Sequence, residues 1–168
     1  SNDQLLYFTS SSLDDSDEHL VLISDRSGHP NLVVRHLASG EEVQLTRNTG
    51  GTLKSYVYFG GNERRGLGKA SVSFDAQRRL LYYIQDDALC CTAFDGSTRI
   101  LNRIPADQVT AFTHISADGQ RLCVPTTDAR ALASLAMARW SVASAVSSSV
   151  RAGTLPPDSS ATCRIRDR

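Results

Sequence analysis

The sequence predicts an all-β fold that forms part of a β-propeller. Two observations predict it: a strand-rich unit recurs along the chain, and each copy breaks into short apolar runs separated by turn residues. The copies span 5–46, 71–105 and 113–128, and the third is incomplete. A self-similar unit of about 40 residues with four strands is typical of a propeller blade. Propellers close into rings of about four to eight blades, so we expect an unfinished ring of two blades and part of a third.

The elements recur in the same order in the first two copies, and the third copy begins in the same way. Leu13, Phe74 and Ile115 each precede a polar turn, and Phe74 and Ile115 lie 41 residues apart. An apolar run follows in all three copies, and a short turn, a third strand, a second turn and a fourth strand then follow in the first two. The predicted strands cover 20–23, 31–37 and 42–46 in the first copy, 80–84, 88–94 and 98–104 in the second, and 122–124 in the third.

Composition excludes several classes of protein. The 168 residues carry no net charge, so no basic field favours nucleic acid or a membrane surface as a partner. No apolar stretch approaches the roughly 20 residues that span a bilayer. The four cysteines match neither a zinc nor a redox spacing, and buried free thiols are typical of a reducing compartment. We therefore expect a cytoplasmic protein, although the chain starts at Ser1 and its true N-terminus is expected to lie upstream.

The composition changes after residue 128. Residues 1–128 are predicted to form the blades, with an insertion at 47–70, while 129–168 form an Ala-, Ser- and Arg-rich tail. Residues 129–142 favour a helix and 147–168 favour a loop. Three origins account for this tail: a native insertion, a disordered extension, or non-native sequence after a truncation.

The insertion contains the strongest candidates for substrate binding. Long loops on a rigid scaffold commonly carry binding groups. Arg side chains bind carboxylates through two hydrogen bonds, and tyrosines stack on sugar rings. Such a set suits an anionic carbohydrate, whereas the alternative is an exposed hairpin with solvated charges. The candidate binding residues are Tyr56, Tyr58, Arg64, Arg65 and Lys69.

His114 is the candidate catalytic residue. It lies in the expected innermost strand of the third copy, at the position that Ser12 and Ser73 occupy in the other copies. Innermost strands line the central channel, where a histidine acts as a general base near neutral pH. The alternative is a histidine satisfied by neighbouring backbone. The four histidines show no metal-binding spacing, so no metal ligand is predicted in this chain.

The motifs resemble a known family. The segment LVLISDRSGHPNLVVRHLASGEEVQLT resembles the blade of bacterial TolB-like and oligogalacturonate-lyase-like propellers. The segments YYIQDDALCCTAFDG and FTHISADGQRLCVPTTDARAL are most similar to the oligogalacturonate lyase group. The resemblance covers 5–132.

This resemblance implies a seven-bladed propeller that cleaves oligogalacturonates, the anionic fragments of pectin, by β-elimination. It implies Mn²⁺ for the full-length parent, with ligands in a C-terminal half that this chain lacks. Thr113-His114 resembles the family's Thr-His pair, although its spacing to the turn at Asp118-Gly119 is shorter. Two alternatives remain: a non-catalytic TolB-like binding scaffold, and a lyase for another uronic-acid polysaccharide.

Overall fold

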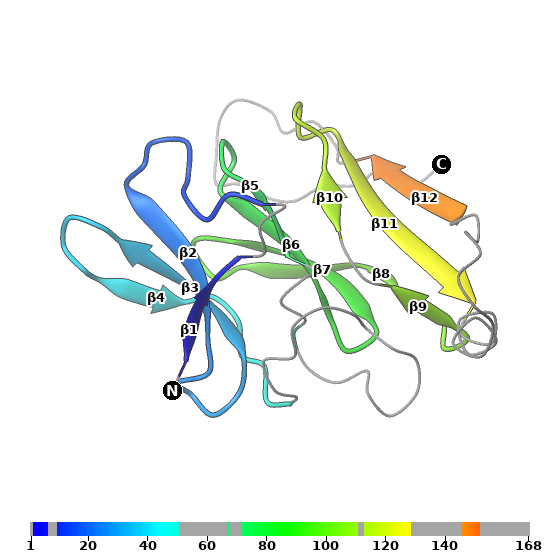
Figure 1. Ribbon diagram of the computed structural model, residues 1–168, viewed down its shortest axis with the longest axis horizontal. Helices are drawn as coiled ribbons and strands as arrows, with labels where there is room; N and C mark the ends of the chain where they lie inside the picture. Colours follow the sequence, from blue (N-terminus) through cyan, green and yellow to red (C-terminus); the bar gives the residue numbers. More distant parts are fainter. Residues whose placement is uncertain are drawn as a thin grey trace, which may run out of the picture.

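The computed structural model describes residues 2–6, 10–50, 67, 72–110 and 113–128, and the backbone of 146–151. These residues form three antiparallel sheets of four strands each, and the described part of the chain contains no helix. The sheets lie side by side in chain order, from blue at the left to orange at the right of Figure 1. The predicted all-β fold is therefore confirmed.

The first sheet follows the strand order of the chain, β1-β2-β3-β4. Gly28 and Gly40 form its turns with positive φ angles of 97° and 73°, a conformation that glycine adopts without steric cost. The fourth strand is shorter than the sequence predicted, and an additional short strand begins the sheet. The strands are β1 (Asp3–Leu5), β2 (His19–Ser24), β3 (Asn31–His36) and β4 (Glu42–Gln44).

The second sheet repeats this arrangement in the order β5-β6-β7-β8. A two-residue turn at Asp86 and Asp87 joins its central hairpin, and Asp86 has a φ of 54°. A bulge interrupts the pairing of β7 with β8 between Leu89 and Cys90. The strands are β5 (Ser73–Asp75), β6 (Leu80–Gln85), β7 (Ala88–Ala93) and β8 (Thr98–Arg103).

The third sheet is built around one long strand. β11 pairs with β9 and β10 along one edge and with β12 along the other. β12 occupies the place of a third strand that the sequence did not predict, because its Ser-rich text lacks the β-branched pattern of the earlier strands. The strands are β9 (Gln108–Thr110), β10 (His114–Ile115), β11 (Arg121–Asp128) and β12 (Val146–Arg151).

The innermost strand of every sheet consists of two pieces. In the third sheet the pieces are β9 and β10. In the first they are β1 and Leu13, which forms a bridge with Leu20, and in the second they are Leu67, which bridges Gln85, and β5. All three repeats therefore contribute two short pieces to the inner edge of their sheet.

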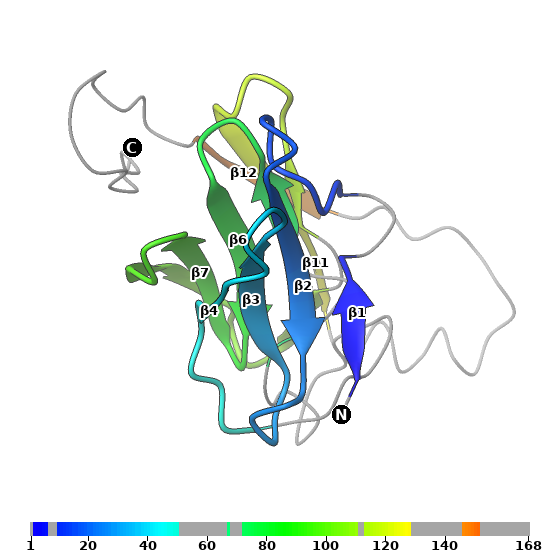
Figure 2. The ribbon, with the colours of Figure 1, turned by 90° about the vertical axis from the view of Figure 1, so that its left-hand side faces the viewer.

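Two apolar layers hold the sheets together. One layer joins β2 and β3 to the second sheet and contains Cys90, and the other joins the second sheet to β11 and contains Cys91. The two adjacent cysteines are buried thiols on opposite faces of β7, because successive residues of a strand point to opposite sides. In Figure 2 the first sheet lies in front of the second, as expected for stacked blades. The second sheet is therefore buried on both faces.

Two arginines on one turn join all three sheets. The Arg79 guanidinium donates to the Asp14 carboxylate of the first sheet at 3.0 Å and to Ser16 at 3.4 Å. The neighbouring Arg78 donates to the Asp118 carbonyl of the third sheet at 3.2 Å. Charged hydrogen bonds to a partner removed from water are stronger than surface ion pairs. This β5–β6 turn therefore fixes the spacing of the sheets along one face of the stack.

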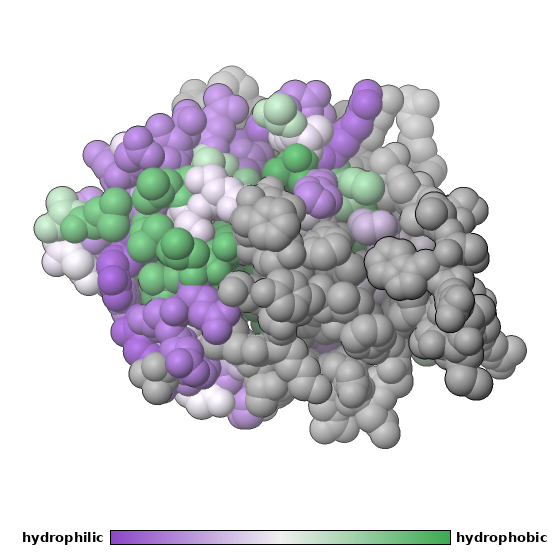
Figure 3. Space-filling model, in the orientation of Figure 1, coloured by the Kyte–Doolittle hydropathy of each residue, from purple (hydrophilic) through white to green (hydrophobic). Residues whose placement is uncertain are grey.

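The first sheet presents apolar surface to solvent. Leu5 is 58% exposed on the face that points away from the second sheet. Leu13, Leu37 and Val43 of the same repeat are also exposed. Figure 3 shows apolar side chains gathered over this sheet, between bands of hydrophilic side chains. No helix among the described residues is long and apolar enough to span a membrane.

Candidate functional site

The inner edges of the second and third sheets are joined by hydroxyl groups. Ser73 donates to the Thr113 carbonyl at 2.5 Å, and the Thr113 hydroxyl donates to Ser73 at 2.8 Å. Ser10 accepts a hydrogen bond from the Phe74 backbone N–H at 3.0 Å and so extends the contact to the first repeat. Both Ser73 and Thr113 are buried. The chain just before His114 is therefore held firmly in place.

His114 lies where the repeat predicted it, in the innermost strand β10. It is exposed, and it pairs directly with Cys123 of β11. The next pair, Ile115 and Leu122, belongs to the apolar layer against the second sheet. Because successive strand residues point to opposite faces, His114 and Cys123 point away from the second sheet. An exposed imidazole in this position can exchange protons with a bound molecule.

The predicted binding residues of the insertion lie outside the described residues. They are Tyr56, Tyr58, Arg64, Arg65 and Lys69. Leu67, within the same insertion, is buried and bridges Gln85 at the end of β6. This bridge ties one point of the insertion to the second sheet.

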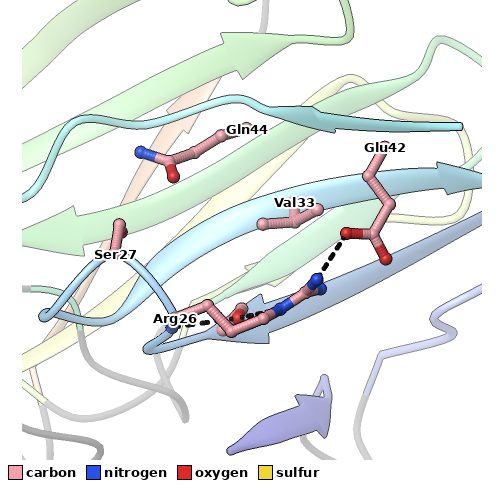
Figure 4. A pocket seen from close by; sticks show the side chains of 6 residues that line it. Arg26, Ser27, Val33, Glu42 and Gln44 are labelled. Carbon is pink, nitrogen blue, oxygen red and sulfur yellow. Dashed lines mark hydrogen bonds and ion pairs between the residues drawn. The ribbon is translucent and has the colours of Figure 1, made fainter. Parts of the chain in front are cut away.

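A charged pocket lies on the outer face of the first sheet (Figure 4). Arg26 reaches from the β2–β3 turn across Val33 and contacts the Glu42 carboxylate at 2.7 Å. Glu42 also accepts from Arg35, and Arg26 donates to Asp3 at 3.1 Å. Hydrogen bonds from Arg26 and then Arg35 hold the pKa of Glu42 below its usual value. The charged side chains of this pocket are paired with one another, so neither Arg26 nor Arg35 presents an unpaired guanidinium to a ligand.

The Asp14 carboxylate accepts hydrogen bonds from several backbone and side-chain donors at once. Its side chain is 0% exposed, yet it accepts from the backbone N–H groups of Glu18 and His19, from Ser16, from the His19 ring and from Arg79. Burial raises the pKa of this carboxyl, but the hydrogen bonds from the His19 backbone and from Ser16 outweigh it and hold the pKa below the usual value. Asp14 is therefore not a solvated residue of an acidic turn, because neighbouring donors replace its water.

His19 and His36 line a hollow of about 400 Å³ between the first and second sheets. Both histidines are half-buried. Their rings meet edge to face at 5.1 Å, and the His19 ring lies 5.5 Å from Phe94 at the end of β7. Neither histidine has a motif spacing in the sequence. Only the pairing of β2 with β3 brings them together.

The described residues contain no group of three His, Cys, Asp or Glu side chains that is placed to hold a metal ion. His114 and Cys123 form a pair, as do His19 and His36. A site held by three protein ligands would therefore require residues beyond those described.

Comparison with known proteins gives the fold. No family model matches the chain, and no curated protein sequence matches it. A solved oligogalacturonate lyase in complex with manganese matches with a TM-score of 0.61 and 15% identity, over 76% of this chain and 31% of that chain. The described sheets share the fold of part of an oligogalacturonate lyase. A crystal structure of oligogalacturonate lyase from Vibrio parahaemolyticus matches with a TM-score of 0.60, the same identity and the same coverage.

This likeness confirms the partial propeller. At 15% identity it shows the fold alone, and the chain spans about a third of the length of the structures that it matches.

Proposed function

We propose that this chain is part of a lyase that cleaves uronic-acid oligosaccharides by β-elimination, with pectin fragments as the substrate class. The observation that carries the proposal is the match of three consecutive sheets to two oligogalacturonate lyases. The place of His114 on the innermost strand supports it, because that strand lies nearest the axis of a propeller ring.

The chemistry requires a base, a group that neutralises the substrate carboxylate, and departure of the glycosidic oxygen. His114 takes the proton at C5 of the uronate, the electrons form the C4–C5 double bond, and the C4–O bond breaks as the leaving glycosidic oxygen takes a proton from water. Ser73 and Thr113 act as positioning residues, because their hydrogen bonds fix the backbone that carries the imidazole. Arg64 and Arg65 bind the carboxylate, since a guanidinium matches its geometry.

Manganese is present in one of the matching lyases. Mn²⁺ prefers carboxylate, carbonyl and water ligands, and the described residues offer no group of three metal-binding side chains. They do not fit such a centre, so no step of the proposed reaction is assigned to a metal held by them.

Binding to the chain itself tests the proposal. Oligogalacturonate is titrated against the 168-residue chain by calorimetry, with its methyl ester as the uncharged control. We expect binding of the acid only, weakened by R64Q and by R65Q and unchanged by H29Q. Equal binding of the ester would contradict carboxylate recognition.

Turnover is measured on a longer protein that contains this chain, as the ultraviolet absorbance of the unsaturated product. We expect H114Q to lower kcat with little change in KM, because the base acts on the reacting proton. Unchanged turnover in H114Q would exclude this residue as the base.

A TolB-like binding scaffold is the second candidate. The observation that favours it is the apolar surface of the first sheet, with Leu5 more than half exposed. Exposed apolar patches commonly mark protein interfaces. A chain that binds no uronic-acid oligosaccharide but loses a protein partner in Leu5→Glu would support the scaffold.

A further inference from the structure

Two histidines face each other across neighbouring strands of the first sheet. His19 of β2 and His36 of β3 are directly opposite in the register. Side chains in opposite positions lie on the same face, with Cβ atoms about 4.5–5.5 Å apart. The rings are 5.1 Å apart between centroids, at an angle of 60°. The pair is therefore built into the sheet and does not depend on a loop conformation.

This separation matches two imidazoles that share one tetrahedral metal ion. Zn–N bonds of about 2.0–2.1 Å at tetrahedral angles place the ring centres about 5 Å apart. The observed 5.1 Å agrees with that value. At this spacing, metal binding would require no separation of the strands.

Both rings use Nδ1 for contacts within the protein. His19 Nδ1 lies 3.0 Å from the buried Asp14 carboxylate, which accepts a hydrogen bond from this nitrogen, so that in the neutral ring the lone pair is on Nε2. Metal-binding histidines commonly have such a carboxylate behind them, because it fixes the tautomer and the orientation of the ring. His36 Nδ1 lies 2.9 Å from the Ser39 hydroxyl. With a metal on Nε2, this nitrogen donates to Ser39 and gives up its contact with the Ser39 backbone N–H at 3.2 Å.

The space beside the rings suits an ion and its water ligands. His19, His36, Ser39 and Glu41 line the hollow of about 400 Å³, together with apolar side chains. Glu41 adds a negative charge to the wall. Imidazole suits zinc, copper and nickel, whereas manganese favours oxygen ligands. A metal at this pair is therefore chemically different from the manganese of the matching lyase.

We propose that His19 and His36 bind a Zn²⁺ ion through their Nε2 atoms, with water in the remaining positions. The site differs from the surroundings of His114, which lies in the third sheet. The ion would join β2 to β3 beside the contact with Phe94 of the second sheet. Its binding would raise the stability of the folded chain in proportion to the logarithm of free zinc above the dissociation constant.

Zinc titration of the 168-residue chain tests the proposal. Histidine ring signals are followed by two-dimensional NMR while ZnCl₂ is added. We expect the signals of His19 and His36 to shift, while those of His29 and His114 stay unchanged. H19Q and H36Q should each weaken zinc binding by more than about tenfold in competition with a fluorescent chelator, and H29Q should leave it unchanged.

Further variants test Asp14, whose carboxylate contacts His19, and two residues of the third sheet, His114 and Cys123. D14N should weaken zinc binding by about 10–100-fold, because it removes the carboxylate that orients the ring. Urea unfolding without zinc, compared between D14N and the parent chain, shows whether the variant still folds. H114Q and C123S should leave zinc binding unchanged. Loss of zinc binding in these two, or full binding in H19Q and H36Q, would overturn the proposal.

Discussion

The second sheet and its two neighbours differ in how many faces they bury. In β6 and β7 every side chain but one is buried, and the two faces contact the first and third sheets. The first sheet packs through one face, and its other face carries the Arg26–Glu42–Arg35 network. The third sheet likewise exposes His114 on its outer face. The same repeat therefore acquires an apolar or a polar face according to its place in the stack.

The amino acids of the strands reflect this difference. The segments LLYYIQ and ALCCTA are almost continuously apolar, as in sheets covered on both sides, whereas NLVVRH ends in charged and polar residues. Burial also acts on the chemistry of the central sheet. It raises the pKa of Tyr83 to about 12 and that of Cys90 to about 11. These groups serve packing, and the candidate chemistry lies on the outer sheets.

The largest expected effect comes from a matched pair of leucines. Leu81 is fully buried in the second sheet, whereas Leu5 is 58% exposed on the first. Leu81→Ala should lower the free energy of unfolding by about 2–5 kcal/mol, because it leaves a cavity. Leu5→Ala should change it by less than about 0.5 kcal/mol. Urea denaturation measures both, and similar losses would show that the outer face is covered in solution.

The arginine contacts between sheets should have the next largest effect. Arg79→Ala removes a charged donor from the buried Asp14 carboxylate and should cost about 1.5–3 kcal/mol. Arg103→Ala removes an exposed ion pair with Asp87 and should cost less than about 1 kcal/mol. The two variants are compared by thermal and urea unfolding. Equal costs would mean that Arg79 contributes no more than a surface ion pair.

Acid should weaken the outer face of the first sheet. The pKa of Glu42 is lowered in the folded chain by Arg26 and Arg35, so its contribution to stability is complete above the ordinary glutamate pKa. That contribution is lost as the pH falls through the lower folded value. E42Q should therefore lose less stability than the parent chain between about pH 5 and pH 3. Parallel slopes in urea unfolding would contradict this, and the effect should be smaller than that of Arg79→Ala.

The smallest expected effect concerns the reactivity of the cysteine thiols and does not change the stability of the chain. Cys90 and Cys91 are buried in the second sheet, while Cys123 is half-buried in the third. Thiols react as thiolates, which burial disfavours. Alkylation mapped by mass spectrometry should label Cys123 before Cys90 and Cys91 in the native chain. Faster labelling of Cys90 would show that the first and second sheets separate.

The repeat made much of the fold predictable. Counting from Phe74 to Ile115 placed His114 in the innermost strand, and the alternation within β7 placed Cys90 and Cys91 on opposite faces. β12 was not predicted because its serines carry no strand pattern and its partner β11 precedes it by a long connection. The proposed roles of Arg64, Arg65, Lys69, Tyr56 and Tyr58 remain predictions.

The sequence by itself determined the repeating unit, the order of strands within it and the apolar character of the central sheet, because these depend on local patterns of two-residue alternation and turn residues. Only the tertiary structure decided which distant polar groups meet. Asp14 is buried because Arg79 of the next repeat reaches it, and His19 faces His36 because the register of β2 and β3 makes them opposite. A shift of one residue in that register would turn one ring to the other face.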